Sequence, residues 1–162
     1  MKLLILSSLL MALIFLIIDI IWLSFAVKSF YRPHIGSLLL DKPVMWAAAL
    51  FYIIYVVGLG VVILQPAINQ DSIKMAFFTG IVFGIVAYGT YNLTNMATIK
   101  NWSSYVVLVD IIWGGLLTGV SSALGIYIAK KIISDFFWIL ICYGRTFFVD
   151  ALAYSRIKTR LC

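Results

Sequence analysis

The chain has 162 residues, of which 64% are hydrophobic and only 11% are charged. Soluble domains carry roughly 25% charged residues, so this composition excludes an ordinary soluble protein and indicates a membrane protein. The formal net charge of +6 would suit nucleic-acid binding in a soluble protein, but here the basic residues stand in short segments beside apolar runs, where they set membrane orientation. We therefore expect the lipid bilayer, and no nucleic acid, as the partner.

Four apolar runs are long enough to cross a bilayer, which takes about 20 residues in a helix. They cover residues 3–27, 46–64, 75–91 and 105–129. A fifth run, residues 136–154, is interrupted by Arg145 and Asp150, and it either crosses the membrane or lies on its surface. The predicted fold is all-α, a polytopic transmembrane helical bundle of four spans plus a possible fifth C-terminal helix.

This pattern divides the chain at residue 131. Residues 1–131 are predicted to form a four-span membrane domain, and residues 132–162 an apolar segment with a basic tail of open topology. The first run exceeds the apolar core of a secretory signal, so we expect it to stay as a span. Arg32 in the first loop and Lys100 in the third favour a cytoplasmic position for both loops.

Polar residues within the runs gather toward one end of the bundle. Asp19 lies in the second half of the first run, three residues before Trp22. Residues 65–72 resemble a turn, which makes the second and third runs antiparallel neighbours. The third run has Gly80 and Gly84 at the spacing of close helix packing, and it continues into a polar stripe of Tyr88, Tyr91, Asn92, Thr94 and Asn95.

The fourth run carries the reverse order, with polar residues before small ones. Asp110 and Trp113 repeat the Asp-Ile-Ile-Trp sequence of the first run, a match too short to indicate a duplication. The small and polar residues that follow are predicted to pack against the glycine face of the third run: Gly114, Thr118, Ser121, Ser122 and Gly125.

Two intramembrane carboxylates are candidates for a functional site, because an Asp in a span costs roughly 2.5–3.5 kcal/mol to insert. If the first, third and fourth helices pack together, Asp19 and Asp110 share one pocket that binds a ligand or exchanges protons. The candidate residues are Asp19, Asp110, Tyr88, Tyr91, Asn92, Thr94, Asn95, Trp22 and Trp113, with Lys100 or Arg32 as countercharge at the mouth. The competing interpretation is that the carboxylates only lock the bundle through interhelical hydrogen bonds.

Other site chemistry is not indicated. The two cysteines form no metal-ligand spacing, and no catalytic triad, phosphate loop or dinucleotide motif is present. We expect no metal and no cofactor, assign no catalytic residue, and consider an enzyme less favoured than a binding protein.

Several segments carry a family resemblance: residues 88–102 with 109–114, Asp19-x-x-Trp22, residues 30–32, residues 49–52 and Pro66-Ala67. Over residues 1–129 the chain resembles a family of small bacterial membrane proteins, domain of unknown function 2177. The resemblance implies a four-span protein of the bacterial inner membrane and carries no established activity. It also implies an aspartate at the position of Asn92.

The predicted function is binding or translocation of a small polar solute, an ion or a lipid headgroup through this one-sided pocket. Four or five spans are few for a monomeric transporter, so we also expect a homodimer. The alternatives are a membrane-embedded enzyme acting on lipid, or an accessory or assembly subunit.

Overall fold

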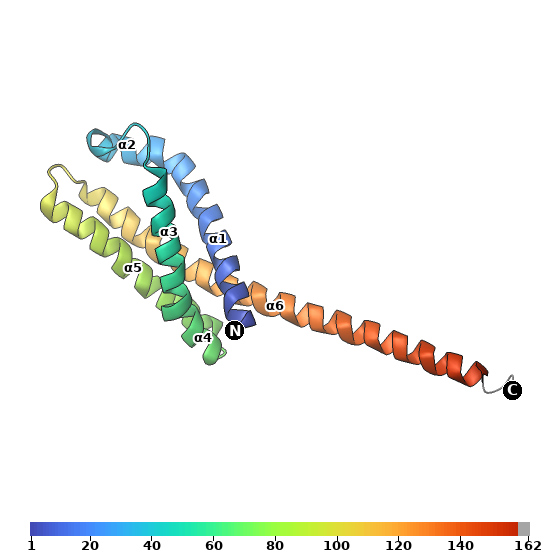
Figure 1. Ribbon diagram of the computed structural model, residues 1–162. Coiled ribbons are helices and arrows are strands. Elements are labelled where there is room, and N and C mark those ends of the chain that lie inside the picture. The colour runs from blue at the N-terminus through green and yellow to red at the C-terminus, as the bar shows by residue number, and fades with distance from the viewer. Residues whose placement is uncertain (159–162) are drawn as a thin grey trace. The chain divides into compact units, whose positions relative to one another are not determined.

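A computed structural model describes the backbone of residues 1–158 and the side chains of residues 1–136, and this part is built from helices joined by turns. It has two compact units, Met1–Ala129 and Lys130–Cys162. The elements are α1 (Lys2–Ala26), a π-helical turn η1 (Val27–Tyr31), α2 (Arg32–Ile35), a 3₁₀ turn η2 (Gly36–Leu38), α3 (Met45–Leu59), a second π-helical turn η3 (Gly60–Leu64), α4 (Gln65–Asn69), α5 (Ile73–Thr98) and α6 (Ser104–Lys158) (Figure 1).

Four helical segments of the described chain are long and apolar enough to cross a membrane, which confirms the predicted all-α bundle. They are Lys2–Leu38, Met45–Asn69, Ile73–Thr98 and Ser104–Phe136. The backbone of α6 continues to Lys158, so the predicted fifth segment is not set off by a turn. The side chains beyond residue 136, with Arg145, Asp150 and both cysteines, lie outside the described residues.

Two prolines are accommodated inside longer helical segments. The turns η1 and η3 end two residues before Pro33 and Pro66, respectively. Proline lacks an N–H and its ring clashes with the carbonyl four residues earlier, and a wider π-helical turn relieves both problems. Arg32 was predicted to lie in a loop and residues 65–72 in a turn. Both interpretations were wrong in part, because residues 28–38 and 65–69 are helical.

The outward and inward faces of α1 show the pattern expected in lipid. Both faces repeat every four residues, as one side of a helix does. The outward face is wholly apolar and exposed: Ile5, Leu9, Leu13 and Ile17. The inward face is buried and includes the polar residues: Ser7, Met11, Phe15 and Asp19.

The interface between α5 and α6 is a seam of glycines, as the spacing in the third run predicts. A Cβ at Gly80 would lie 2.8 Å from the Cα of Gly119. A Cβ at Gly84 would overlap the backbone carbonyl of Gly114. The two backbones therefore touch at these positions, and small residues permit this approach in lipid, where helices associate by packing rather than by hydrophobicity.

The other face of α6 packs on α1 and α3. A Cβ at Gly125 would lie 2.8 Å from the Cβ of Met11, and Ser122 contacts the Met11 sulfur. Thr118, which also borders Gly84 in the glycine seam, shares a 2.8 Å hydrogen bond with Tyr55 of α3. The prediction that Ser122 and Gly125 face the third run was thus wrong, because these residues lie on the side of α6 that meets α1.

The connections fix which ends of the helices meet. Asp71 and Asn101 adopt positive φ angles of 50° and 60° in the turns before α5 and α6, a conformation that Asp and Asn tolerate better than most residues. Ser72 caps α5 by accepting a hydrogen bond from the Met75 amide. In Figure 1 the α5–α6 turn and α2 lie at one end of the first unit, and the N-terminus and α4 at the other. The first and third connections therefore share one end, which we call the α2 end.

Candidate functional site

Asp110 is a buried carboxylate near the α2 end, with 6% of its surface exposed. The hydroxyl of Tyr31, at the end of η1, donates to its Oδ1 at 2.5 Å. The amide of Asn92, on α5, donates to its Oδ2 at 3.2 Å. Asn92 also donates to the carbonyl of Tyr88 on its own helix, which fixes its orientation.

Asp19 is equally buried, at 7% exposure, and has a matching pair of donors. The hydroxyl of Tyr52, on α3, donates to its Oδ2 at 2.6 Å. The indole N–H of Trp113, on α6, donates to its Oδ1 at 3.3 Å. Each carboxylate is therefore held by one tyrosine and one N–H donor from other helices.

A stacked tryptophan pair links the two carboxylates. The rings of Trp22 and Trp113 lie 4.4 Å apart at an angle of 19°. Trp113 donates to Asp19, and Trp22 donates to the hydroxyl of Tyr31 at 3.3 Å. The helices α1 and α6 run in opposite directions, and each Trp stands three residues after the Asp of its own helix. Trp113 therefore reaches Asp19 directly, and Trp22 reaches Asp110 through Tyr31. We call these seven residues the carboxylate network: Asp19, Trp22, Tyr31, Tyr52, Asn92, Asp110 and Trp113.

The network leaves hydrogen-bonding capacity on both carboxylates. An ionised carboxylate offers about four acceptor positions, and each Asp uses two of them. The hydrogen-bond partners of both carboxylates are neutral, and no lysine or arginine among the described side chains pairs with Asp19 or Asp110. A cationic or hydrogen-bond-donating ligand could therefore bind without displacing a protein partner.

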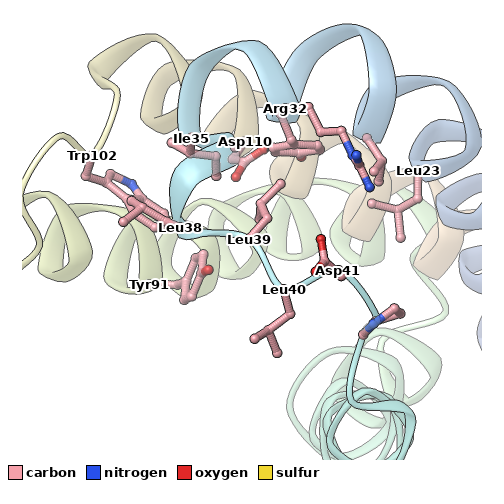
Figure 2. A pocket seen from close by; sticks show the side chains of 14 residues that line it. Leu23, Arg32, Ile35, Leu38, Leu39, Leu40, Asp41, Tyr91, Trp102 and Asp110 are labelled. Atoms are coloured by element: carbon pink, nitrogen blue, oxygen red, sulfur yellow. The ribbon is translucent and has the colours of Figure 1, made fainter.

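A cavity of about 810 Å³ lies at the α2 end, and Asp110 forms part of its wall (Figure 2). This volume is within the range of about 300–1,000 Å³ typical of small-ligand sites. The wall combines charged, aromatic and apolar side chains from four parts of the chain: Leu23, Val27, Tyr31, Arg32, Ile35, Gly36, Leu38, Leu39, Leu40, Asp41, Pro43, Tyr91, Trp102 and Asp110.

The structure brings most of the predicted site residues to this region. Asp19, Asp110, Asn92, Trp22 and Trp113 belong to the network, and Arg32 and Tyr91 line the cavity. The Tyr88 ring lies against Gly114, and no hydrogen bond from its hydroxyl to the network is formed in the described part of the chain.

Besides Tyr88, three further predicted residues belong neither to the cavity wall nor to the network. Thr94 is exposed and donates to the carbonyls of Thr90 and Tyr91 on its own helix. Asn95 is half-buried and Lys100 is exposed in the α5–α6 turn. Their roles in ligand binding stay predictions without support from the geometry.

Sequence reasoning missed two tyrosines that hold the carboxylates, Tyr31 and Tyr52. The signal for Tyr52 was present: with Tyr55 it supplies the hydroxyl groups of the apolar helix α3. Both find partners on other helices, Asp19 and Thr118. Tyr31 stands in a segment that was predicted as a loop, so its direction could not be assigned from helical spacing.

Substituting Tyr52 by phenylalanine is expected to reduce the free energy of unfolding by about 1 kcal/mol, within the range of interhelical hydrogen bonds in membranes. The change leaves the ring in place and removes the short hydrogen bond to Asp19. The matched control is Tyr127→Phe, because that side chain on α6 is 53% exposed. Unfolding in mixed micelles measures both, and equal losses in the two variants would contradict the assigned bond.

A family model described as "predicted membrane protein", domain of unknown function 2177, matches residues 4–127. The match includes all seven residues of the carboxylate network. No curated protein and no solved structure matches the chain. Four helices among the described residues are long and apolar enough to span a membrane and fit an integral membrane protein. With more than two thirds of its length matched, the chain belongs to this family of predicted membrane proteins of unknown function.

Proposed function

We propose that this protein binds a small polar ligand or a lipid headgroup in the cavity at the α2 end, within a bacterial inner membrane. The observation that carries the proposal is the position of Asp110, a buried carboxylate in the wall of an 810 Å³ cavity. Its two protein donors fix its orientation and leave acceptor positions for a ligand.

The cost of the carboxylates supports a role in binding. A carboxylate at the centre of a span costs roughly 2.5–3.5 kcal/mol on insertion scales, while interhelical hydrogen bonds in membrane proteins return only about 0.6 kcal/mol each on average. Asp19 lies near the middle of the first candidate span, and its two hydrogen bonds do not offset this cost. A purely structural role would therefore be served better by apolar residues of similar shape.

The lining of the cavity favours an amphiphilic or partly charged ligand. Arg32 and Asp41 add a positive and a negative side chain to the wall, and both are exposed. Tyr91 and Trp102 form an aromatic part of the wall, with ring centroids 5.8 Å apart at an angle of 81°. A site with polar groups of both signs beside apolar walls orients a ligand that has distinct polar and apolar parts.

Substituting Gly36 by phenylalanine is expected to remove binding without unfolding the protein. Gly36 lines the cavity in a helical conformation, and the nearest atom to a Cβ added there is the Cβ of Arg32 at 3.9 Å. The backbone therefore accepts a side chain, and the ring would fill the cavity. The matched control is Gly58→Phe on α3, where a new Cβ would meet nothing within 4 Å.

The number of ligand molecules that stay bound is measured by native mass spectrometry, on protein released from nanodiscs of bacterial total polar lipid extract. We expect the wild type and Gly58→Phe to retain one more bound molecule than Gly36→Phe. Equal retention by all three proteins would contradict the proposal, as would a wild type that retains nothing.

A further inference from the structure

We propose that the ligand of this cavity carries a phosphate joined to a primary ammonium group, the headgroup chemistry of phosphatidylethanolamine. The phosphate pairs with Arg32, and the ammonium group pairs with the carboxylates of the wall, Asp41 and Asp110. This inference rests on the proposed function and names the ligand class for the same site.

The charges of the wall have both signs, and each charged side chain comes from a different element. Arg32 begins α2, Asp41 lies in the segment after η2, and Asp110 lies on α6. Figure 2 shows these three side chains around the same cavity. One cationic and two anionic side chains line the wall. A ligand that carries both a positive and a negative charge therefore leaves fewer of these side chains without an oppositely charged partner than an anion or a cation alone.

The donor and acceptor types select the two ligand groups. The arginine guanidinium presents a planar set of N–H donors that matches the oxygens of a phosphate. The carboxylates accept hydrogen bonds and donate none when ionised, so they favour an ammonium group that has N–H bonds. A quaternary ammonium such as choline has no N–H to donate, and the glycerol headgroup of phosphatidylglycerol has no positive charge.

The apolar part of the wall provides a path for an acyl chain. Leu38, Leu39 and Leu40 line the cavity, and Leu40 is 69% exposed. The backbone is extended at Leu39, between the first candidate span, which ends at Leu38, and the second, which begins at Met45. The cavity thus lies between the end of the first candidate span and the start of the second, and we place the lipid headgroup at this level.

Substituting Arg32 by glutamine is expected to lower retention of phosphatidylethanolamine about tenfold, the change that about 1.4 kcal/mol produces. Asp41→Asn should lower it as well. The matched control is Lys42→Gln, which removes the same charge as Arg32→Gln from an exposed position next to Asp41 in the sequence that does not line the cavity. Because Arg32 and Asp41 are both exposed, neither substitution is expected to unfold the bundle.

The measurement is native mass spectrometry from nanodiscs that contain equal amounts of phosphatidylethanolamine, phosphatidylcholine and phosphatidylglycerol. We expect the wild type and Lys42→Gln to retain phosphatidylethanolamine in preference to the other two lipids. A second arm adds soluble phosphoethanolamine. If it displaces the lipid, the natural ligand is a soluble molecule with this chemistry, and if it does not, the acyl chain is part of recognition.

The outcomes separate this inference from the proposed function. A wild type that retains the three lipids equally, while Gly36→Phe still loses one bound molecule, would overturn the assigned headgroup and leave ligand binding intact. Preference for phosphatidylethanolamine that survives Arg32→Gln and Asp41→Asn would overturn the assigned side chains.

Discussion

Substituting Gly84 by alanine is expected to reduce the free energy of unfolding by about 3 kcal/mol, at the upper end of the usual cost of overpacking. The new Cβ would overlap the backbone carbonyl of Gly114 and would lie 2.8 Å from the hydroxyl oxygen of Thr118. A backbone carbonyl in a helix cannot rotate away, so α5 and α6 must separate. In lipid, close packing is the main source of the association of α5 with α6, and separating the helices removes it.

The matched control for this prediction is Gly89→Ala, five residues further along α5. A Cβ at Gly89 would meet the end of the Ile111 side chain at 3.8 Å, an ordinary contact. Alanine is favoured over glycine in a helix by up to about 1 kcal/mol, so this variant is expected to be neutral or slightly stabilised. Unfolding in mixed micelles measures both variants, and equal stability of the two would show that the seam tolerates a methyl group.

The same seam connects packing to the site. Gly84 and Asn92 lie on α5 eight residues apart, and Gly114 and Asp110 lie on α6 four residues apart. Separating the helices at Gly84 therefore also lengthens the 3.2 Å hydrogen bond from Asn92 to Asp110. The glycine variant should lose ligand binding along with stability.

Much of the fold follows from composition and spacing. The four spans were predicted because apolar runs of this length are typical of transmembrane helices. The contact of α5 with α6 was predicted because Gly80 and Gly84 have the spacing of close helix packing. The grouping of Asp110 with Asn92 followed from the alternating direction of the spans.

The remaining features depend on helix rotation and on backbone geometry that spacing does not reveal. Ser122 and Gly125 share a small-residue pattern with Gly114, but they contact α1 because α6 packs against helices on more than one side. Tyr31 reaches Asp110 because the π-helical turn η1 keeps the chain helical up to Pro33. A proline is usually read as a helix end, so this geometry was not expected.

Substituting Asp110 by leucine is expected to reduce the free energy of unfolding by about 2 kcal/mol, since a buried donor without a partner costs roughly 1–3 kcal/mol. Two donors lose their bond to Asp110: the hydroxyl of Tyr31, and the amide of Asn92, which keeps its bond to the Tyr88 carbonyl. The leucine itself favours the membrane interior, which limits the loss. Unfolding in mixed micelles measures the change.

The triple variant Asp110→Leu, Tyr31→Phe, Asn92→Leu decides between a structural and a functional role for the network. It removes the carboxylate together with both donors, and the group that it deprives of a partner is the indole N–H of Trp22, which is only half-buried. Replacing a buried polar network by apolar residues of similar shape is often neutral or stabilising. We therefore expect stability to return to near the wild-type value while ligand retention falls at least about tenfold.

Each result has a distinct meaning. A stable triple variant that no longer binds shows that the chain keeps Asp110 and the cavity-lining hydroxyl of Tyr31 for its ligand, at a cost that packing alone would not justify. If the triple variant remains as unstable as Asp110→Leu alone, the hydrogen bonds of Tyr31 and Asn92 hold the α2 end together, and the carboxylate is structural. If it is stable and binds like the wild type, the ligand does not contact Asp110, and Arg32 and Asp41 carry the recognition at the cavity mouth.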